Sequence, residues 1–181
     1  MIPEDLVPPD CPFPIVLGID PGTRHMGWGA LLLVPENPRF VACGVLDLPL
    51  REPVPVRLGV LLEELETMLG RLRPAWVAIE GAFSAQNARS ALRIGEARGV
   101  VMGAVARRGV RIEEIAPAAA KKAIVGNGAA SKEQVARMVG HLLGIEVANL
   151  KDDATDALAL AWSVAQKLRF AEHLAPAARR R

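Results

Sequence analysis

The order of the apolar segments constrains the fold of this chain most strongly. Three short apolar runs, at Ile15–Ile19, Met26–Val34 and Phe40–Leu48, precede the first helical pattern. They are separated only by an Asp-Pro-Gly turn at 20–22 and by a proline-bounded turn at 35–38. Apolar runs of this length bounded by turn residues predict strands, and short connections predict antiparallel neighbours. We therefore expect the chain to begin with a three-stranded antiparallel meander.

The rest of the chain alternates between helical and strand patterns. Leucines recur at helical spacing within Val56–Leu72, which predicts an amphipathic helix. Further strands are expected at Ala75–Ile79 and Val110–Ile115, and further helices at about Ala85–Arg107, Ala118–Ile124, Ser131–Leu143 and Asp153–Arg169. A meander followed by alternating strands and helices predicts an α/β fold with a five-stranded mixed sheet flanked by helices.

Length and composition predict one globular domain with two short extensions. The chain has 181 residues, which suits a single core, and we place the domain at 14–170. Residues 1–13 are proline-rich and are expected to form a flexible arm, and residues 171–181 form a basic tail. The N-terminal pattern is not that of a signal peptide, and no apolar run approaches the ~20 residues of a membrane span. These features predict a cytoplasmic protein without a membrane partner.

Acidic residues follow the ends of predicted strands and begin the last predicted helix. Asp20 closes the first strand, Glu80 closes the fourth, and Asp152, Asp153 and Asp156 lie at the helix start. In open α/β sheets, sites gather at the carboxyl ends of strands, so these acids are expected to meet. Clustered carboxylates are suited to two Mg²⁺ ions that catalyse an in-line phosphodiester displacement.

Each acid also has a structural explanation, and spacing alone does not select the helix pair. Asp153 and Asp156 share a helix face, but so do Asp152 and Asp156. An Asp at a helix start is often an N-cap, which is the interpretation favoured for Asp152. Glu80 at a strand end could simply reach solvent, and many Asp-Pro-Gly sequences such as that at Asp20 are plain turns.

Four short motifs, in this order, resemble the RuvC family over about residues 17–166. They are Leu-Gly-Ile-Asp-Pro-Gly-Thr at 17–23, Ala-Ile-Glu at 78–80 followed by Phe83 and Asn87, Ala-Arg-Gly at 97–99, and Asp-Ala-Thr-Asp-Ala-Leu-Ala at 153–159. The stretch 125–132, Val-Gly-Asn-Gly-Ala-Ala-Ser-Lys, also resembles the family's glycine-containing segment before a lysine. Each motif is weak alone, and the ordered set is specific.

The resemblance implies a ribonuclease H-like fold and an endonuclease that resolves Holliday junctions in DNA recombination and repair. It implies paired symmetric nicks made with two Mg²⁺ ions per site, for which Mn²⁺ could substitute. The implied metal ligands are Asp20, Glu80, Asp153 and Asp156, which selects Asp153 over Asp152. Some relatives carry His at the position of Asp153, so this ligand is the most replaceable of the four.

The resemblance also assigns roles to basic and aromatic residues. Lys121 and Lys132 match lysines near the scissile phosphate, and Lys122 could share the role of Lys121. Phe83 matches an aromatic that stacks on a base, although a Phe is more often part of a core. The expected DNA contacts are Phe83, Asn87, Arg89, Arg93 and Lys122. Each of these arginines could equally belong to a solvated surface.

Glycines 95, 99 and 103 recur at intervals of four within the predicted helix 85–107. Glycine destabilises a helix by about 1 kcal/mol relative to Ala, so a stripe of three suggests close packing of another backbone. That backbone could belong to the chain's own sheet or to a second copy, since the resemblance implies a homodimer, and both could hold on different faces of the helix. RuvA and RuvB, the junction-binding and motor proteins, are implied partners.

Three other functions fit parts of the pattern. A sugar-kinase or actin-like ATPase also begins with an Asp-x-Gly strand turn, but it needs a second phosphate motif and roughly twice this length. A YqgF-type relative acting on RNA should lack Phe83 and the lysine positions. A junction-binding scaffold without activity would be expected to have lost some of the four acids, and all four are present.

Overall fold

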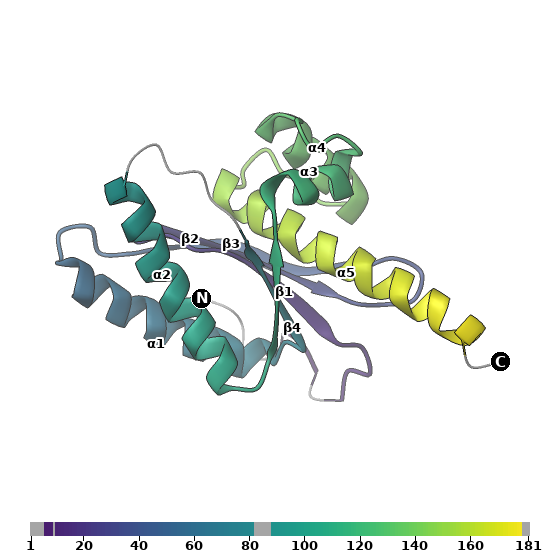
Figure 1. Ribbon diagram of the computed structural model, residues 1–181, viewed down its shortest axis with the longest axis horizontal. Helices are drawn as coiled ribbons and strands as arrows, with labels where there is room; N and C mark the ends of the chain where they lie inside the picture. Colours follow the sequence, from purple (N-terminus) through teal and green to yellow (C-terminus); the bar gives the residue numbers. More distant parts are fainter. Residues whose placement is uncertain (1–5, 9, 82–87, 179–181) are drawn as a thin grey trace.

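A five-stranded mixed sheet forms the centre of the protein (Figure 1). The computed structural model describes residues 6–8, 10–81 and 88–178, with side chains as far as residue 171. The strands are β1 (Ile15–Asp20), β2 (His25–Leu32), β3 (Arg39–Asp47), β4 (Trp76–Glu80) and β5 (Arg111–Ile115), in the spatial order β3-β2-β1-β4-β5. The first three form the expected antiparallel meander, while β4 runs parallel to β1, and β5 runs parallel to β4.

Helices cover both faces of the sheet (Figure 1). They are α1 (Val54–Leu72), α2 (Ala88–Arg107), α3 (Pro117–Val125), α4 (Lys132–Leu143) and α5 (Asp152–Ala178). The first two pack on one face around one cluster of buried apolar residues, and the last three pack on the other face around a second cluster. The expected α/β fold class is confirmed.

The alternation of side chains along β1 determines which layer each residue faces. Leu17 and Ile19 belong to the core beneath α1 and α2, whereas Val16 belongs to the core beneath α5. Gly18 also faces α5, because a Cβ built there would meet the backbone of that helix. Successive strand residues point to opposite faces, so Asp20 follows Val16 and Gly18 onto the α5 side.

Three glycines let the backbone of α5 lie directly on the sheet. A Cβ added to Gly18 would lie 1.9 Å from the carbonyl oxygen of Ala157, and one added to Gly27 would lie 2.0 Å from that of Asp153. A Cβ on Gly29 would meet the side chain of Leu158 at 2.7 Å. Glycine weakens a strand interior and is found there where another backbone approaches closely. The start of α5 is thereby held against β1 and β2.

The structure differs from the sequence-based expectations mainly at segment ends. The last helix, expected to end near Arg169, continues to Ala178. The helix begins at Asp152 rather than at Asp153. Asp152, for which an N-cap position was favoured, therefore lies in the first turn of the helix. In the N-terminal segment, Leu6 and Val7 pack against the core beneath α1 and α2. Among the described residues, no helix has both the length and the apolar content to cross a bilayer.

We predict that Gly18→Ala lowers the free energy of unfolding by about 3 kcal/mol or more, because the added methyl group has to displace the α5 backbone. Gly59 is the matched control: it lies exposed within α1, and a Cβ there meets nothing within 4 Å. Gly59→Ala should raise stability by about 0.5–1 kcal/mol. Urea unfolding of both variants measures the difference. Equal effects would contradict the close approach of α5.

Candidate active site

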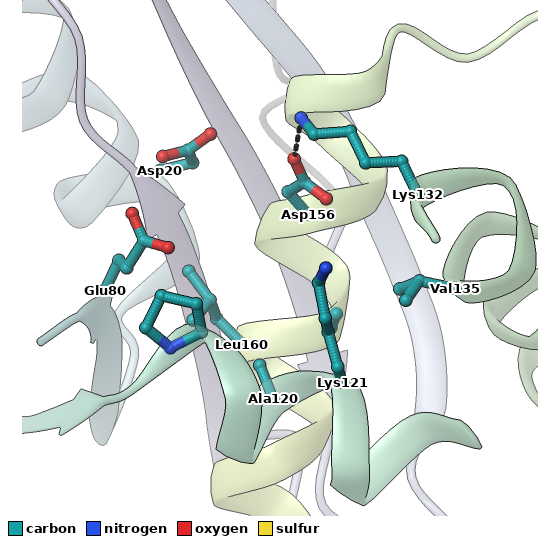
Figure 2. Close-up of a pocket in the computed structure, with 10 residues that line it drawn as sticks. Asp20, Glu80, Ala120, Lys121, Lys132, Val135, Asp156 and Leu160 are labelled. Carbon is teal, nitrogen blue, oxygen red and sulfur yellow. Dashed lines mark hydrogen bonds and ion pairs between the residues drawn. The ribbon is translucent and has the colours of Figure 1, made fainter. Parts of the chain in front are cut away.

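A pocket of about 310 Å³ lies where β1 and β4 end (Figure 2). Its polar lining consists of three carboxylates and two lysines, which are Asp20, Glu80, Asp156, Lys121 and Lys132. Its apolar lining comes from α3, α4 and α5 and includes Ala120, Val135 and Leu160. Three of the four expected metal ligands and both expected catalytic lysines therefore share one cavity.

Strand register brings Asp20 and Glu80 together. In the parallel pair, Gly18 lies opposite Ala78 and Ile19 opposite Ile79, so the next position of each strand carries an acid. Ala78 faces the α5 side of the sheet, and Glu80, two residues later, faces the same side. Both carboxylates consequently point into the pocket, although 60 positions separate them in the sequence.

Asp156 enters the pocket from the first part of α5, and Lys132 reaches it from the start of α4 (Figure 2). The Lys132 Nζ atom lies 2.7 Å from the Asp156 Oδ2 atom in an ion pair. The residues after Asp156, beginning with Ala157 and Leu158, are fully buried and hold this part of the helix against the sheet. The ion pair therefore joins two helices at the pocket.

The pocket brings several carboxylates together where they are partly shielded from water. Burial raises the pKa of Asp20 from 3.8 to about 7, with smaller contributions from Glu80, Asp156 and Asp153, and Lys132 opposes the shift. Burial, followed by the charge of Asp156, also raises the pKa of Glu80. The pKa of Lys132 is raised chiefly by its hydrogen bond to Asp156. An added cation would relieve the repulsion among these acids.

The carboxylates fit a hard divalent cation in their chemistry. Their oxygens are the ligands that Mg²⁺ prefers, and Mg²⁺ commonly keeps several waters or substrate oxygens rather than being caged by protein. Within the described ranges, no group of three or more His, Cys, Asp or Glu is arranged to hold an ion by itself. Asp20, Glu80 and Asp156 would supply only part of the coordination.

Asp153 lines a second, neighbouring hollow of about 410 Å³ rather than the first pocket. This hollow is also lined by Arg24, Arg89 and Arg93, and Arg93 is paired with Glu96 at 2.8 Å. Asp153 is still close enough for its charge to raise the pKa of Asp20. Asp152 is exposed and lines neither hollow.

The other expected site residues have different placements. The Lys121 Nζ atom donates a hydrogen bond to the carbonyl oxygen of Ala130 at 2.8 Å, at the pocket wall. Lys122 is exposed and does not line the pocket. Phe83 and Asn87 lie outside the described residues.

A polar contact that no sequence pattern indicated lies close to Asp20. The Arg57 Nη1 atom, from α1, donates to the carbonyl oxygen of Thr23 at 2.8 Å, in the turn that follows Asp20. The Nε atom of Arg57 is buried without a hydrogen-bond partner among the described residues. No local pattern marks this arginine, because its partner lies 34 residues earlier in the chain.

The glycine stripe of α2 faces away from the chain's own sheet. A Cβ added to Gly95, Gly99 or Gly103 would meet nothing within 4 Å among the described residues. Leu92 lies one turn before Gly95 and is 61% exposed. Of the two explanations that the sequence left open, packing on the chain's own sheet is therefore wrong for the described residues.

We predict that Asp20→Asn raises the free energy of unfolding of the metal-free protein at pH 8 by roughly 1–3 kcal/mol. Because the folded pKa of Asp20 lies above its unfolded value, wild-type stability should fall as pH rises from about 4 to about 7. The Asn variant lacks this contribution to the pH dependence. Urea unfolding with EDTA at pH 5 and pH 8 measures it. A variant less stable than wild type at pH 8 would contradict the proposed electrostatic cost.

Comparison with known proteins identifies the family. The family model described as crossover junction endodeoxyribonuclease RuvC matches residues 16–164. The RuvC endonuclease of Chlorobaculum parvum is 40% identical over 148 residues, which is 82% of this chain and 79% of that protein. That of Chloroflexus aurantiacus is 42% identical over 145 residues, covering 80% and 88% respectively.

Solved structures agree with the family match. T. thermophilus RuvC in complex with Holliday junction substrate superimposes with a TM-score of 0.81 at 34% identity, covering 87% of this chain and 96% of that one. The yeast mitochondrial Holliday junction resolvase Ydc2 has a TM-score of 0.59 at 17% identity, which shows a shared ribonuclease H-like fold. The chain therefore belongs to the RuvC family of crossover junction endodeoxyribonucleases.

Proposed function

We propose that this protein is a structure-selective endonuclease that resolves Holliday junctions by paired symmetric nicks, in DNA recombination and repair. The observation that carries the proposal is the pocket in which Asp20, Glu80 and Asp156 meet Lys121 and Lys132. The relative solved with a Holliday junction substrate matches 87% of the chain. This pocket has the charge and the donor atoms for metal-assisted phosphodiester hydrolysis.

Asp20, Glu80, Asp153 and Asp156 would hold two Mg²⁺ ions, for which Mn²⁺ could substitute. When bound, such ions activate the attacking water and neutralise the leaving oxygen of the phosphodiester. The buried position of Asp20 favours this use. Burial and the neighbouring acids make its carboxylate unfavourable in the metal-free protein, and a bound cation would stabilise that negative charge. Asp153 would act from the edge of the neighbouring hollow.

Lys121 and Lys132 would interact with the scissile phosphate. Both line the pocket, and each now donates to an oxygen of the protein, of Ala130 and of Asp156 respectively. A phosphate oxygen is an acceptor of the same kind, so either lysine can stabilise the charge that develops during cleavage. Lys122, beside Lys121, would make a DNA contact outside the pocket.

The hollow beside Asp153 would accommodate the DNA backbone. Arg24, Arg89 and Arg93 line it, and Arg24 and Arg89 form no ion pair with any described residue. Such arginines suit phosphate contacts, which position the DNA, whereas the shape and deformability of a four-way junction distinguish it from a duplex. Phe83 and Asn87 remain expected DNA contacts from their place in the family motif.

The open face of α2 supports a homodimer. Gly95, Gly99 and Gly103 leave the helix backbone uncovered beside the exposed Leu92, so a second α2 can lie closely on this face. Two active sites related by two-fold symmetry match a junction that needs two symmetric cuts. RuvA and RuvB would be partners through family membership.

Cleavage of a labelled four-way junction with Mg²⁺ tests the function, with a linear duplex as the substrate control. We expect symmetric nicks in the junction alone, and Asp20→Asn should cut at least about 100-fold more slowly, since metal contacts supply several kcal/mol of charge stabilisation. Asp152→Asn is the matched control, because Asp152 is exposed and lines neither hollow. Binding without cutting, with Mg²⁺ and with Mn²⁺, would favour a scaffold, and cutting of RNA instead would favour the YqgF-type alternative.

We predict that Gly99→Leu shifts the sedimentation of the protein from dimer toward monomer, because the larger side chain separates the two helices. Gly59→Leu is the control, since Gly59 is also exposed within a helix and has nothing within 4 Å of an added Cβ. Circular dichroism confirms that each variant is folded. An unchanged sedimentation coefficient for Gly99→Leu would remove α2 from the dimer interface.

A further inference from the structure

Arg98 connects the middle of α2 to the end of β4. Its Nε atom donates a hydrogen bond to the carbonyl oxygen of Glu80 at 3.2 Å, and its Nη2 atom lies 2.5 Å from the Glu114 Oε2 atom. The Arg98 side chain is only 19% exposed. Arg98 is the central residue of the Ala-Arg-Gly motif at 97–99, which has no role in the site described above.

Arg98 and the Glu80 carboxylate lie on opposite faces of the sheet. The carboxylate points into the pocket on the α5 side, whereas Arg98 approaches from the α2 side and bonds the main chain. Burial and the charge of Asp156 raise the pKa of Glu80, while Lys132 opposes the shift. Arg98 therefore fixes the backbone of Glu80 without placing a cation where it would compete with a metal ion.

The edge strand β5 holds Arg98 in place. Glu114 of β5 is its ionic partner, and the backbone N–H of Gly81 donates to the carbonyl oxygen of Ile115 at 2.9 Å. A Cβ on Gly81 would lie 3.1 Å from the Cβ of Glu114, so little space remains between the two chains. The planar guanidinium offers several donors in fixed directions, so one side chain bonds both the Glu80 carbonyl and the Glu114 carboxylate.

We propose that Arg98, held by Glu114, is a positioning residue that fixes Glu80 in the orientation needed for metal binding. The inference rests on the proposed function, in which Glu80 is a metal ligand. Displacement of a reacting group by about 1 Å can slow catalysis by about 100-fold, so partial loosening of Glu80 should produce a smaller but measurable loss. The loss should appear in metal binding as well as in cleavage.

Two adjacent glutamates of β5 provide a matched comparison. Glu114 pairs with Arg98 on the α2 side, and Glu113 pairs with Lys167 of α5, with a closest N–O distance of 2.5 Å in each pair. Glu114→Gln and Glu113→Gln thus each remove one ion pair from the same strand. Only the first removes the partner of the arginine that bonds Glu80. Arg98→Gln and Arg98→Lys complete the set.

The first measurement is the apparent dissociation constant for Mg²⁺, fitted to the dependence of melting temperature on Mg²⁺ concentration without DNA, since stabilisation grows as RT ln(1 + [Mg²⁺]/Kd). The second is the Mg²⁺ dependence of junction cleavage, at a temperature where every variant is folded. We expect Glu114→Gln and Arg98→Gln to raise this dissociation constant, and the Mg²⁺ concentration for half-maximal cleavage, by about 3–10-fold. This is a smaller loss than that caused by a displaced reacting group. Glu113→Gln should match wild type, Arg98→Lys should be intermediate, and junction binding in EDTA should be unchanged. The double variant Arg98→Gln/Glu114→Gln should be no worse than Arg98→Gln, since Glu114 acts through Arg98.

Two results would overturn the proposal. One is an unchanged Mg²⁺ dependence for Arg98→Gln, and the other is an equal change for Glu113→Gln, which would indicate a general effect of weakening β5. The same two measurements on wild-type protein distinguish failure of the positioning role from failure of the proposed function. If wild type shows neither Mg²⁺-dependent stabilisation nor junction cleavage, the proposed function fails and the positioning role fails with it.

Discussion

The contact between the backbone of α5 and the strands β1 and β2 supports the rest of the site. Gly18 and Gly27 leave no strand side chain between the sheet and the helix backbone, and Gly29 leaves room for the side chain of Leu158. As a result, the first turns of α5 come close to the strand ends and bring Asp156 into the same pocket as Asp20 and Glu80. A larger residue at these glycines would displace the helix and separate the acids, so packing and chemistry depend on one geometric constraint.

Bringing these acids together lowers the stability of the metal-free fold. Burial and neighbouring acids raise the pKa of Asp20 to about 7, which means that its charged form is unfavourable in the metal-free fold. Lys132 offsets part of this cost through its ion pair with Asp156. Such local destabilisation is common where activity requires unpaired charge, and it is tolerated because the surrounding core is well packed. The Asp20→Asn comparison therefore links unfolding measurements to the electrostatics of the site.

The layer formed by α1 and α2 supports the acids from the opposite face of the sheet. Arg57 of α1 bonds a carbonyl oxygen three residues after Asp20, and Arg98 of α2 bonds the carbonyl oxygen of Glu80. Both arginines contact the main chain rather than the carboxylates. The negative charge of the pocket is thus not neutralised by these arginines, and the two strand ends are held by hydrogen bonds from the opposite face of the sheet.

The sequence alone determined the strand meander, the alternation that follows it and the acids at the strand ends, because periodicity and turn residues are local properties. It did not decide how far Asp153 stands from the main pocket, which face the stripe containing Gly99 presents, or which groups Arg57 and Arg98 bond. These features depend on strand register and on helix placement between segments far apart in the chain. For example, the hydrogen bond from Arg98 to the Glu80 carbonyl oxygen forms only because α2 lies near the end of β4. No local sequence pattern specifies where these two elements lie relative to each other. Tertiary structure therefore decided how the acids are held, whereas the sequence decided which acids are present.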